Sequence, residues 1–86
     1  MEINILKESK DELEFEIDGL TIAEILKVYL NQDSSVEFAA WKQVHPTEKP
    51  IVLVRTKGKT AKKAVHDAIN VITKELDRLE KDFDKL

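Results

Sequence analysis

Hydrophobic and polar residues alternate near the start of the chain, a pattern typical of β-strands with one solvated face. In Glu2–Lys7, Ile3 and Ile5 are separated by polar Asn4, which predicts an edge strand. A polar turn over Glu8–Glu12 follows. Leu13–Asp18 then alternates strictly, with three apolar residues inward and three acids outward. The two segments together predict an antiparallel hairpin.

A helical pattern begins after Gly19. Thr21, with Glu24 three residues later, matches a capping box, in which each side chain bonds to the backbone N–H of the other residue. The apolar residues that share one helical face are Ile22, Ile25, Leu26, Tyr29 and Leu30. The polar run Asn31–Ser35 is expected to end the helix.

Two more strands and a second helix are predicted in the rest of the chain. Val36–Gln43 is a strand with Val36, Phe38 and Ala40 on one face and Ala39 and Trp41 on the other. The segment Ile51–Lys57 is a strand that is apolar on both faces as far as Val54. Gly58 ends that strand, and Thr60 is placed to cap a helix reaching Leu86.

The resulting order is ββαββα, which predicts an α+β fold. Strands that arrive as hairpins form an antiparallel sheet, so we expect a two-layer sandwich of four strands with both helices on one face. The length of 86 residues indicates a single domain, residues 1–86.

The last helix carries a heptad pattern. Its apolar residues are spaced alternately by four and three positions: Val65, Ile69, Ile72, Leu76, Leu79, Phe83 and Leu86. About 27 helical residues extend roughly 40 Å, whereas strands of six or seven residues extend roughly 20 Å. The end of the helix must therefore overhang the sheet, with Leu76, Leu79, Phe83 and Leu86 available to a protein partner.

Composition excludes several classes of protein. The chain has no cysteine, so disulfides, thiolate nucleophiles and zinc–thiolate sites are impossible. Its longest apolar runs, Phe38–Trp41 and Ile51–Val54, are far shorter than the roughly 20 residues of a membrane span. The first residues lack the basic and apolar regions of a secretory signal. We therefore expect a cytoplasmic protein with no membrane contact.

Sequence motifs do not support catalysis, and we predict no catalytic residue, cofactor or metal site. Gly58-Lys59-Thr60 resembles the end of a P-loop, but Leu53 occupies the position of the required first glycine. The only histidines, His45 and His66, lie on different predicted elements, so they do not form a metal-ligand set.

The net charge of −3 is unevenly distributed. Residues 1–37 carry a net −7, residues 38–63 a net +6 and residues 64–86 a net −2. A basic cluster surrounds the start of the last helix: Arg55, Lys57, Lys59, Lys62 and Lys63. Aromatic residues do not interleave with these bases as in RNA-reading sheets, so we expect no direct sequence-specific nucleic-acid binding. Loose phosphate contact within a larger assembly stays open.

The stretch Phe38-Ala39-Ala40-Trp41, followed by His45-Pro46, resembles archaeal DNA-directed RNA polymerase subunit L, the smaller α-like subunit family. The strand Ile51–Arg55, the turn Thr56-Lys57-Gly58 and the long charged helix match that family in order and spacing. One departure lies at the first helix, where Leu20 and Glu24 replace the usual His and Asn.

The resemblance implies a non-catalytic assembly subunit that pairs with the larger α-like RNA polymerase subunit and contacts other polymerase subunits. The residues expected at this interface are Ile25, Tyr29, Trp41, Leu76, Leu79 and Phe83, with Trp41 on a second contact face. Two alternatives stay open. In the first, the isolated chain forms a homodimer in which the heptad row of apolar residues, the seam, packs against the seam of a second copy. In the second, the chain is a small pterin-dehydratase-like enzyme, which would share the fold but would need clustered histidines.

Overall fold

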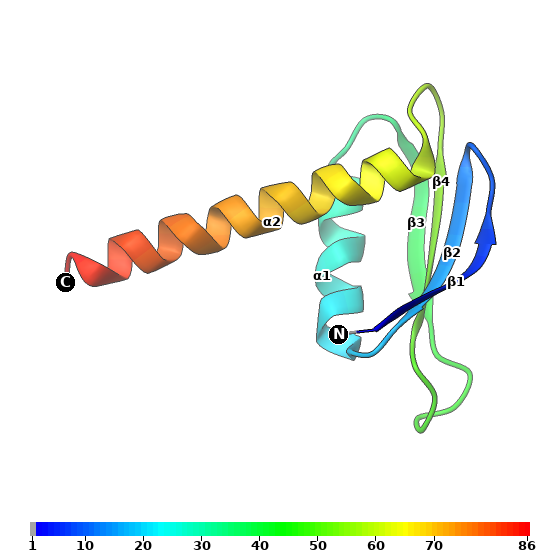
Figure 1. The fold of residues 1–86 in the computed structure, drawn as a ribbon, viewed down its shortest axis with the longest axis horizontal. Helices are drawn as coiled ribbons and strands as arrows, with labels where there is room; N and C mark the ends of the chain where they lie inside the picture. Colours follow the sequence, from blue (N-terminus) through cyan, green and yellow to red (C-terminus); the bar gives the residue numbers. More distant parts are fainter. Residues whose placement is uncertain (1) are drawn as a thin grey trace.

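A computed structural model describes residues 2–86 as one four-stranded sheet and two helices. The strands are β1 (Ile3–Glu8), β2 (Glu12–Ile17), β3 (Val36–Lys42) and β4 (Ile51–Thr56), and the helices are α1 (Leu20–Asn31) and α2 (Ala61–Asp84). The sheet order is β1-β2-β4-β3, with every neighbouring pair antiparallel. Both helices lie on the same side of the sheet, and α2 extends far beyond it (Figure 1). The predicted ββαββα architecture is confirmed.

The core lies between the sheet and the two helices. Leu13, Phe15 and Ile17 of β2 point into it, as the strict alternation predicts. The other buried apolar residues come from both helices, the central strand β4 and the edge strand β3: Ala23, Leu26, Leu30, Ala39, Val52, Val54, Ala61, Ala64 and Ala68. Every buried residue of α2 is an alanine, so this helix joins the core through small side chains.

A β-bulge changes the expected faces of β3. The pairing shifts between Val36, which lies opposite Thr56, and Phe38, which lies opposite Arg55. One extra residue in the strand moves the following side chains to the other face. Val36 therefore packs against the core while Phe38 is 49% exposed on the far side of the sheet. The expectation that these two residues share a face is wrong.

The first helix begins without the predicted capping box. Leu20 is already helical and Gly19 is the N-cap, with no side-chain cap bond. The N–H of Ala23 donates instead to the carbonyl of Gly19 at 3.1 Å. Because the helix starts two residues earlier than the capping box requires, Thr21 lies inside the first turn and the Thr21–Glu24 prediction is wrong.

The second helix begins as predicted. Thr60 is its N-cap and accepts a bond from the N–H of Lys63 at 3.1 Å. Gly58 precedes this cap with a φ of +87°, a left-handed conformation that favours glycine. The sharp turn at Gly58 directs the chain from the end of β4 back across the sheet, so it sets where α2 starts.

Candidate protein-interaction surface

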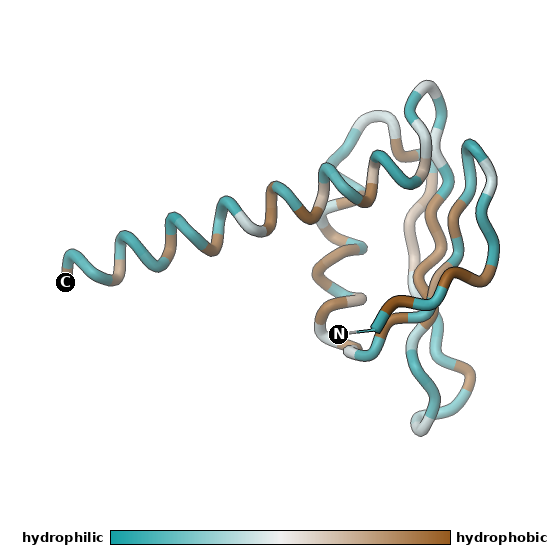
Figure 2. Tube along the Cα trace, in the orientation of Figure 1, coloured by the Kyte–Doolittle hydropathy of each residue, from teal (hydrophilic) through white to brown (hydrophobic). Residues whose placement is uncertain are grey.

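The second half of α2 leaves the body of the molecule with a row of exposed apolar side chains. Leu76 is 60% exposed, Leu79 65%, Phe83 71% and Leu86 98%. We call these four residues the α2 ridge. Figure 2 shows hydrophobic positions recurring along this free part of the helix. The predicted overhang is confirmed, and burying each large side chain would contribute roughly 1.5–3 kcal/mol.

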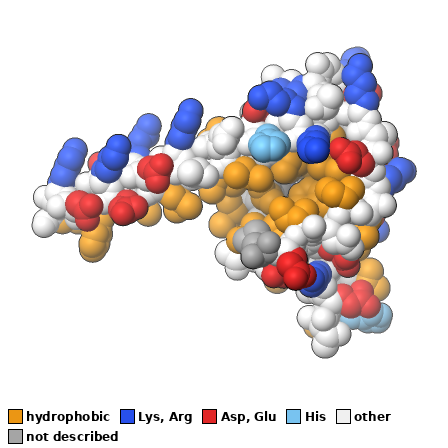
Figure 3. Space-filling view, viewed as in Figure 1, with side chains coloured by type: hydrophobic (Ala, Val, Ile, Leu, Met, Phe, Trp, Pro, Cys, Tyr) orange, Lys and Arg blue, Asp and Glu red, His pale blue; other side chains and the backbone are white. Residues whose placement is uncertain are grey.

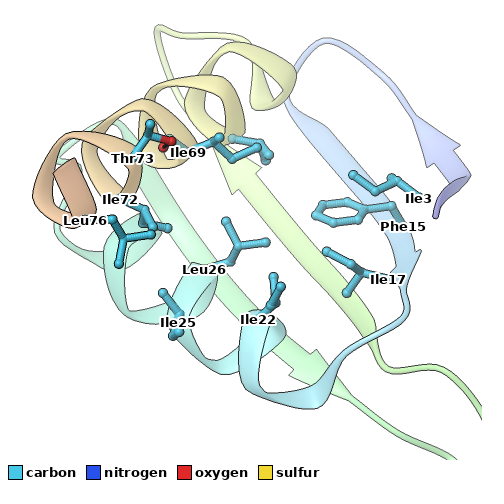
Figure 4. A pocket seen from close by; sticks show the side chains of 11 residues that line it. Ile3, Phe15, Ile17, Ile22, Ile25, Leu26, Ile69, Ile72, Thr73 and Leu76 are labelled. Atoms are coloured by element: carbon cyan, nitrogen blue, oxygen red, sulfur yellow. Dashed lines mark hydrogen bonds between the residues drawn. The ribbon is translucent and has the colours of Figure 1, made fainter. Parts of the chain in front are cut away.

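An apolar groove lies beside the base of this ridge. It has a volume of about 290 Å³ and is formed by β1, β2, α1 and α2 (Figure 4). The residues lining it are Ile3, Phe15, Ile17, Ile22, Ile25, Leu26, Val65, Ile69, Ile72, Thr73 and Leu76. Thr73 is the only polar side chain among them, and its hydroxyl donates to the carbonyl of Ile69 at 2.9 Å. The groove is therefore suited to apolar groups, not to polar substrates.

The groove is open because β1 is left uncovered on its inner side. Ile3 lies opposite Ile17 and Ile5 opposite Phe15, so both face the layer occupied by the helices. They remain 53% and 49% exposed, whereas Ile17 and Phe15 are buried. Since α2 runs away from the sheet instead of along it, nothing in residues 2–86 covers this strand (Figure 1).

Tyr29 connects the two helices at the edge of this surface. Its ring packs against the core, and its hydroxyl donates a hydrogen bond to the Glu75 carboxylate. That bond raises the pKa of Tyr29 above its usual value, because deprotonation would remove the donated proton next to a negative charge. Glu75 directly precedes the ridge, so the bond ties the direction of the α2 overhang to α1.

The six predicted interface residues occupy different places. Ile25 and Leu76 line the groove, and Leu79 and Phe83 continue the ridge. Tyr29 links α1 to α2 beside them. Trp41 does not line the groove; it lies opposite Val52 on the edge strand β3 and is half-buried against the core.

Sequence reasoning missed the contributions of β1 and of the inner part of α2. Ile3 and Ile69 line the groove, at 53% and 41% exposure, and Ile22 joins them from the start of α1. The available signal was the exposed alternation of Ile3 and Ile5 in a strand at the edge of the sheet. That alternation predicted an inner face but not the absence of a helix over it.

Ion pairs within the chain neutralise most of the basic cluster at the start of α2. Lys59 binds Asp33 at 2.7 Å and Asp67 at 2.8 Å, and Lys63 binds the other oxygen of Asp67 at 3.0 Å. Arg55 similarly pairs with a glutamate of β2 at 3.4 Å. These bases therefore hold the α1–β3 turn and β2 in place, which weakens the case for a phosphate site here.

The described residues contain no group of three or more acidic or histidine side chains placed to hold a metal ion. His45 lies in the exposed β3–β4 loop, and His66 is exposed on α2. Neither helix in residues 2–86 is both long and apolar enough to cross a bilayer.

The molecule has a large surface for its mass. Its accessible area is 6183 Å² for 9.9 kDa, whereas a folded monomer of that mass exposes about 5200 Å². Its radius of gyration is 13.9 Å, against about 12 Å for a compact domain of this length. The excess of about 1000 Å² is close to the roughly 800 Å² that each partner buries in a standard interface.

Residues 11–82 match the family model described as the RNA polymerase Rpb3/Rpb11 dimerisation domain. The chain belongs to this family. The match includes β2, α1 and α2 as far as residue 82, with Leu76 and Leu79 of the α2 ridge; Phe83 and Leu86 lie beyond it. The family assignment confirms the resemblance drawn from the sequence. The function of this domain is an assembly role through dimerisation within an RNA polymerase.

Relatives support the same family. The chain is 42% identical over 66 residues to RNA polymerase subunit Rpo11 of Saccharolobus islandicus, covering 73% of this chain and 72% of the relative. It is 33% identical over 88 residues to Rpo11 of Sulfurisphaera tokodaii, covering 99% and 88%. A probable RNA polymerase II subunit RPB11 of Plasmodium falciparum is 33% identical over 70 residues, and the aligned part spans only 56% of its length.

The fold also matches a solved structure. The crystal structure of DNA-directed RNA polymerase subunit L from Thermoplasma acidophilum aligns with a TM-score of 0.87, covering 98% of this chain and 86% of that one. The two are 22% identical in sequence, so this likeness concerns the fold.

Proposed function

We propose that this chain, as a single dimerisation domain over residues 1–86, forms a one-to-one heterodimer with the larger α-like subunit of a cytoplasmic RNA polymerase. The pair would be a non-catalytic platform on which other polymerase subunits assemble. The observation that carries the proposal is the exposed α2 ridge beside an open apolar groove in a chain of the Rpb3/Rpb11 family.

The ridge and the groove together form the proposed contact surface. Leu79 and Phe83 would be the main anchors, because they are large, apolar and more than half exposed in the isolated chain. Ile25 and Tyr29 would extend the contact onto α1. Trp41 lies apart from the groove and is proposed to contribute a second contact from the edge strand.

Changing two anchors to acids tests this interface. The double variant Leu79→Asp with Phe83→Asp is expected to abolish pairing with the larger α-like subunit, because two unpaired charges would be buried at the contact. The sheet should stay folded, since both residues lie outside the core. Co-expression followed by size-exclusion chromatography measures pairing, and circular dichroism measures folding.

Val44→Asp provides a control. Val44 is 63% exposed, similar to Leu79, but lies in the β3–β4 loop. This variant is expected to elute in a one-to-one complex like the wild type. Normal co-elution of the double variant with the larger α-like subunit would contradict the proposed interface.

A further inference from the structure

Acidic side chains border the α2 ridge on both sides. Glu75 and Asp82 directly precede the seam residues Leu76 and Phe83, and Glu80 directly follows Leu79. In a heptad these are the g and e positions, which flank the apolar seam and face the partner helix. All three acids are exposed, and the Glu75 carboxylate also accepts the hydrogen bond from Tyr29. The seam therefore has negative charge along each edge.

The basic residues of the same segment are kept away from the seam. Lys74, Arg78, Lys81 and Lys85 recur at steps of four, three and four, so they form their own stripe. At about 100° per residue this stripe lies on the side of the helix opposite the ridge. Figure 3 shows basic side chains along one edge of the overhang, hydrophobic ones along the opposite edge and acidic ones between them.

This arrangement distinguishes between partners. If two copies of this chain paired along their ridges, the e and g positions would place acid opposite acid, and like charges in that position are destabilising. The bases of the outer stripe point away from the contact and would not neutralise them. A partner helix with Lys or Arg beside its own apolar seam would instead form ion pairs along both edges.

We propose that the α2 ridge selects a partner helix whose apolar seam is flanked by Lys or Arg, and that its acidic borders keep two copies of this chain from pairing. This inference rests on the proposed function, because it specifies the chemistry of the partner surface there. It separates a heterodimer from the homodimer that the apolar seam by itself would allow.

Neutralising the borders tests the exclusion of self-pairing. The variant Glu80→Gln with Asp82→Asn is expected to self-associate about tenfold more tightly than the wild type. The two substitutions remove two negative charges from each copy, and therefore four from the contact of a symmetric dimer. The control Asp77→Asn with Asp84→Asn removes the same charge from the same helix outside the e and g positions, and should behave like the wild type. Sedimentation equilibrium at low salt measures both.

Raising the salt concentration provides a second measurement. Self-association of the wild type should increase with salt, because screening weakens repulsion between the exposed acids. A wild-type chain that already dimerises tightly at low salt would overturn the proposal. Equal self-association of the border variant and its control would overturn it as well.

Charge reversal tests the choice of partner. Glu80→Lys with Asp82→Lys is expected to weaken binding to the larger α-like subunit about tenfold, while Asp77→Lys with Asp84→Lys leaves it nearly unchanged. If the wild type binds and both variants bind equally well, the proposal fails and the proposed function stands. If the wild type does not bind that partner, the proposed function fails, and self-association still decides whether the acidic borders prevent pairing.

Discussion

At the scale of single residues, Lys59 is the main electrostatic link in the molecule. It lies in the β4–α2 turn and binds Asp33, in the turn after α1, and Asp67, in the second turn of α2. The hydrogen bond from Lys59 is the largest cause that lowers the pKa of both aspartates, and the two carboxylates raise the pKa of Lys59. One side chain thus joins three segments that are distant in sequence.

The stability of this link depends on pH. Because the pKa values of Asp33 and Asp67 are lowered, these carboxylates stabilise the fold above their unfolded pKa of 3.8. This stabilisation is lost as pH falls through their lower pKa values in the folded state. The raised pKa of Lys59 means that its contribution is present below the unfolded value of 10.5 and is lost as pH rises through the higher folded value. The link therefore stabilises the fold throughout the neutral range.

Lys59→Met is expected to lower the free energy of unfolding at pH 7 and to reduce its dependence on pH in the acid range. Methionine keeps the length of the apolar stem but donates no hydrogen bond to either aspartate. Urea unfolding at pH 7 and at several values below pH 4 measures the difference. A gap between variant and wild type that stays constant as pH falls would contradict the assignment of the lowered pKa values to Lys59.

At the scale of elements, α2 has two halves with different roles. In its first half, small alanine side chains are buried in the core, and Ala64 is 1% exposed. The heptad positions of this half hold Val65, Ile69 and Ile72, next to the buried alanines. In the second half the same heptad positions hold Leu76, Leu79 and Phe83, which are mostly exposed because the helix has passed the end of the sheet.

Ala64→Leu is expected to destabilise the fold by about 1–3 kcal/mol, because a larger side chain at this fully buried position would overpack the core. Lys62→Leu, on the exposed side of the same turn, is expected to change stability by no more than about 0.5 kcal/mol. Chemical denaturation of both variants measures the difference. Equal stability would show that Ala64 does not pack in the core as described.

At the scale of the whole molecule, the shape is a compact body with one protruding arm. The principal extents are 44 × 35 × 17 Å, and the longest dimension follows α2 (Figure 1). The body contains the core, whereas the arm, residues 76–86 at the end of α2, has few contacts beyond its own helical hydrogen bonds. Such a region opens locally at a lower free-energy cost than the core does.

Hydrogen exchange is expected to show this difference directly. In the isolated chain, backbone amides of residues 76–86 should exchange much faster than those of β4, because the arm can unfold without disrupting the core. Formation of the complex with the larger α-like subunit should slow exchange in the arm and in the groove residues of α1. An arm that is as strongly protected as β4 in the isolated chain would contradict the proposed role.

The sequence by itself determined the features that depend on local periodicity. The alternation of Leu13, Phe15 and Ile17 established a half-buried strand, and the heptad spacing identified the ridge from Leu76 to Leu86. The length of α2 compared with the strands already required an overhang. These predictions succeeded because side-chain direction along a strand or helix follows from backbone geometry alone.

Only the tertiary structure decided which of these faces are covered. The groove joins Ile3, Ile25 and Ile69, which no local pattern connects, and it is open because α2 leaves the sheet before reaching β1. The sequence pattern also did not predict the bulge in β3 or the early start of α1 at Leu20, since each depends on how neighbouring segments pair. Burial is a relation between elements, so periodicity predicts an apolar face but not what lies against it.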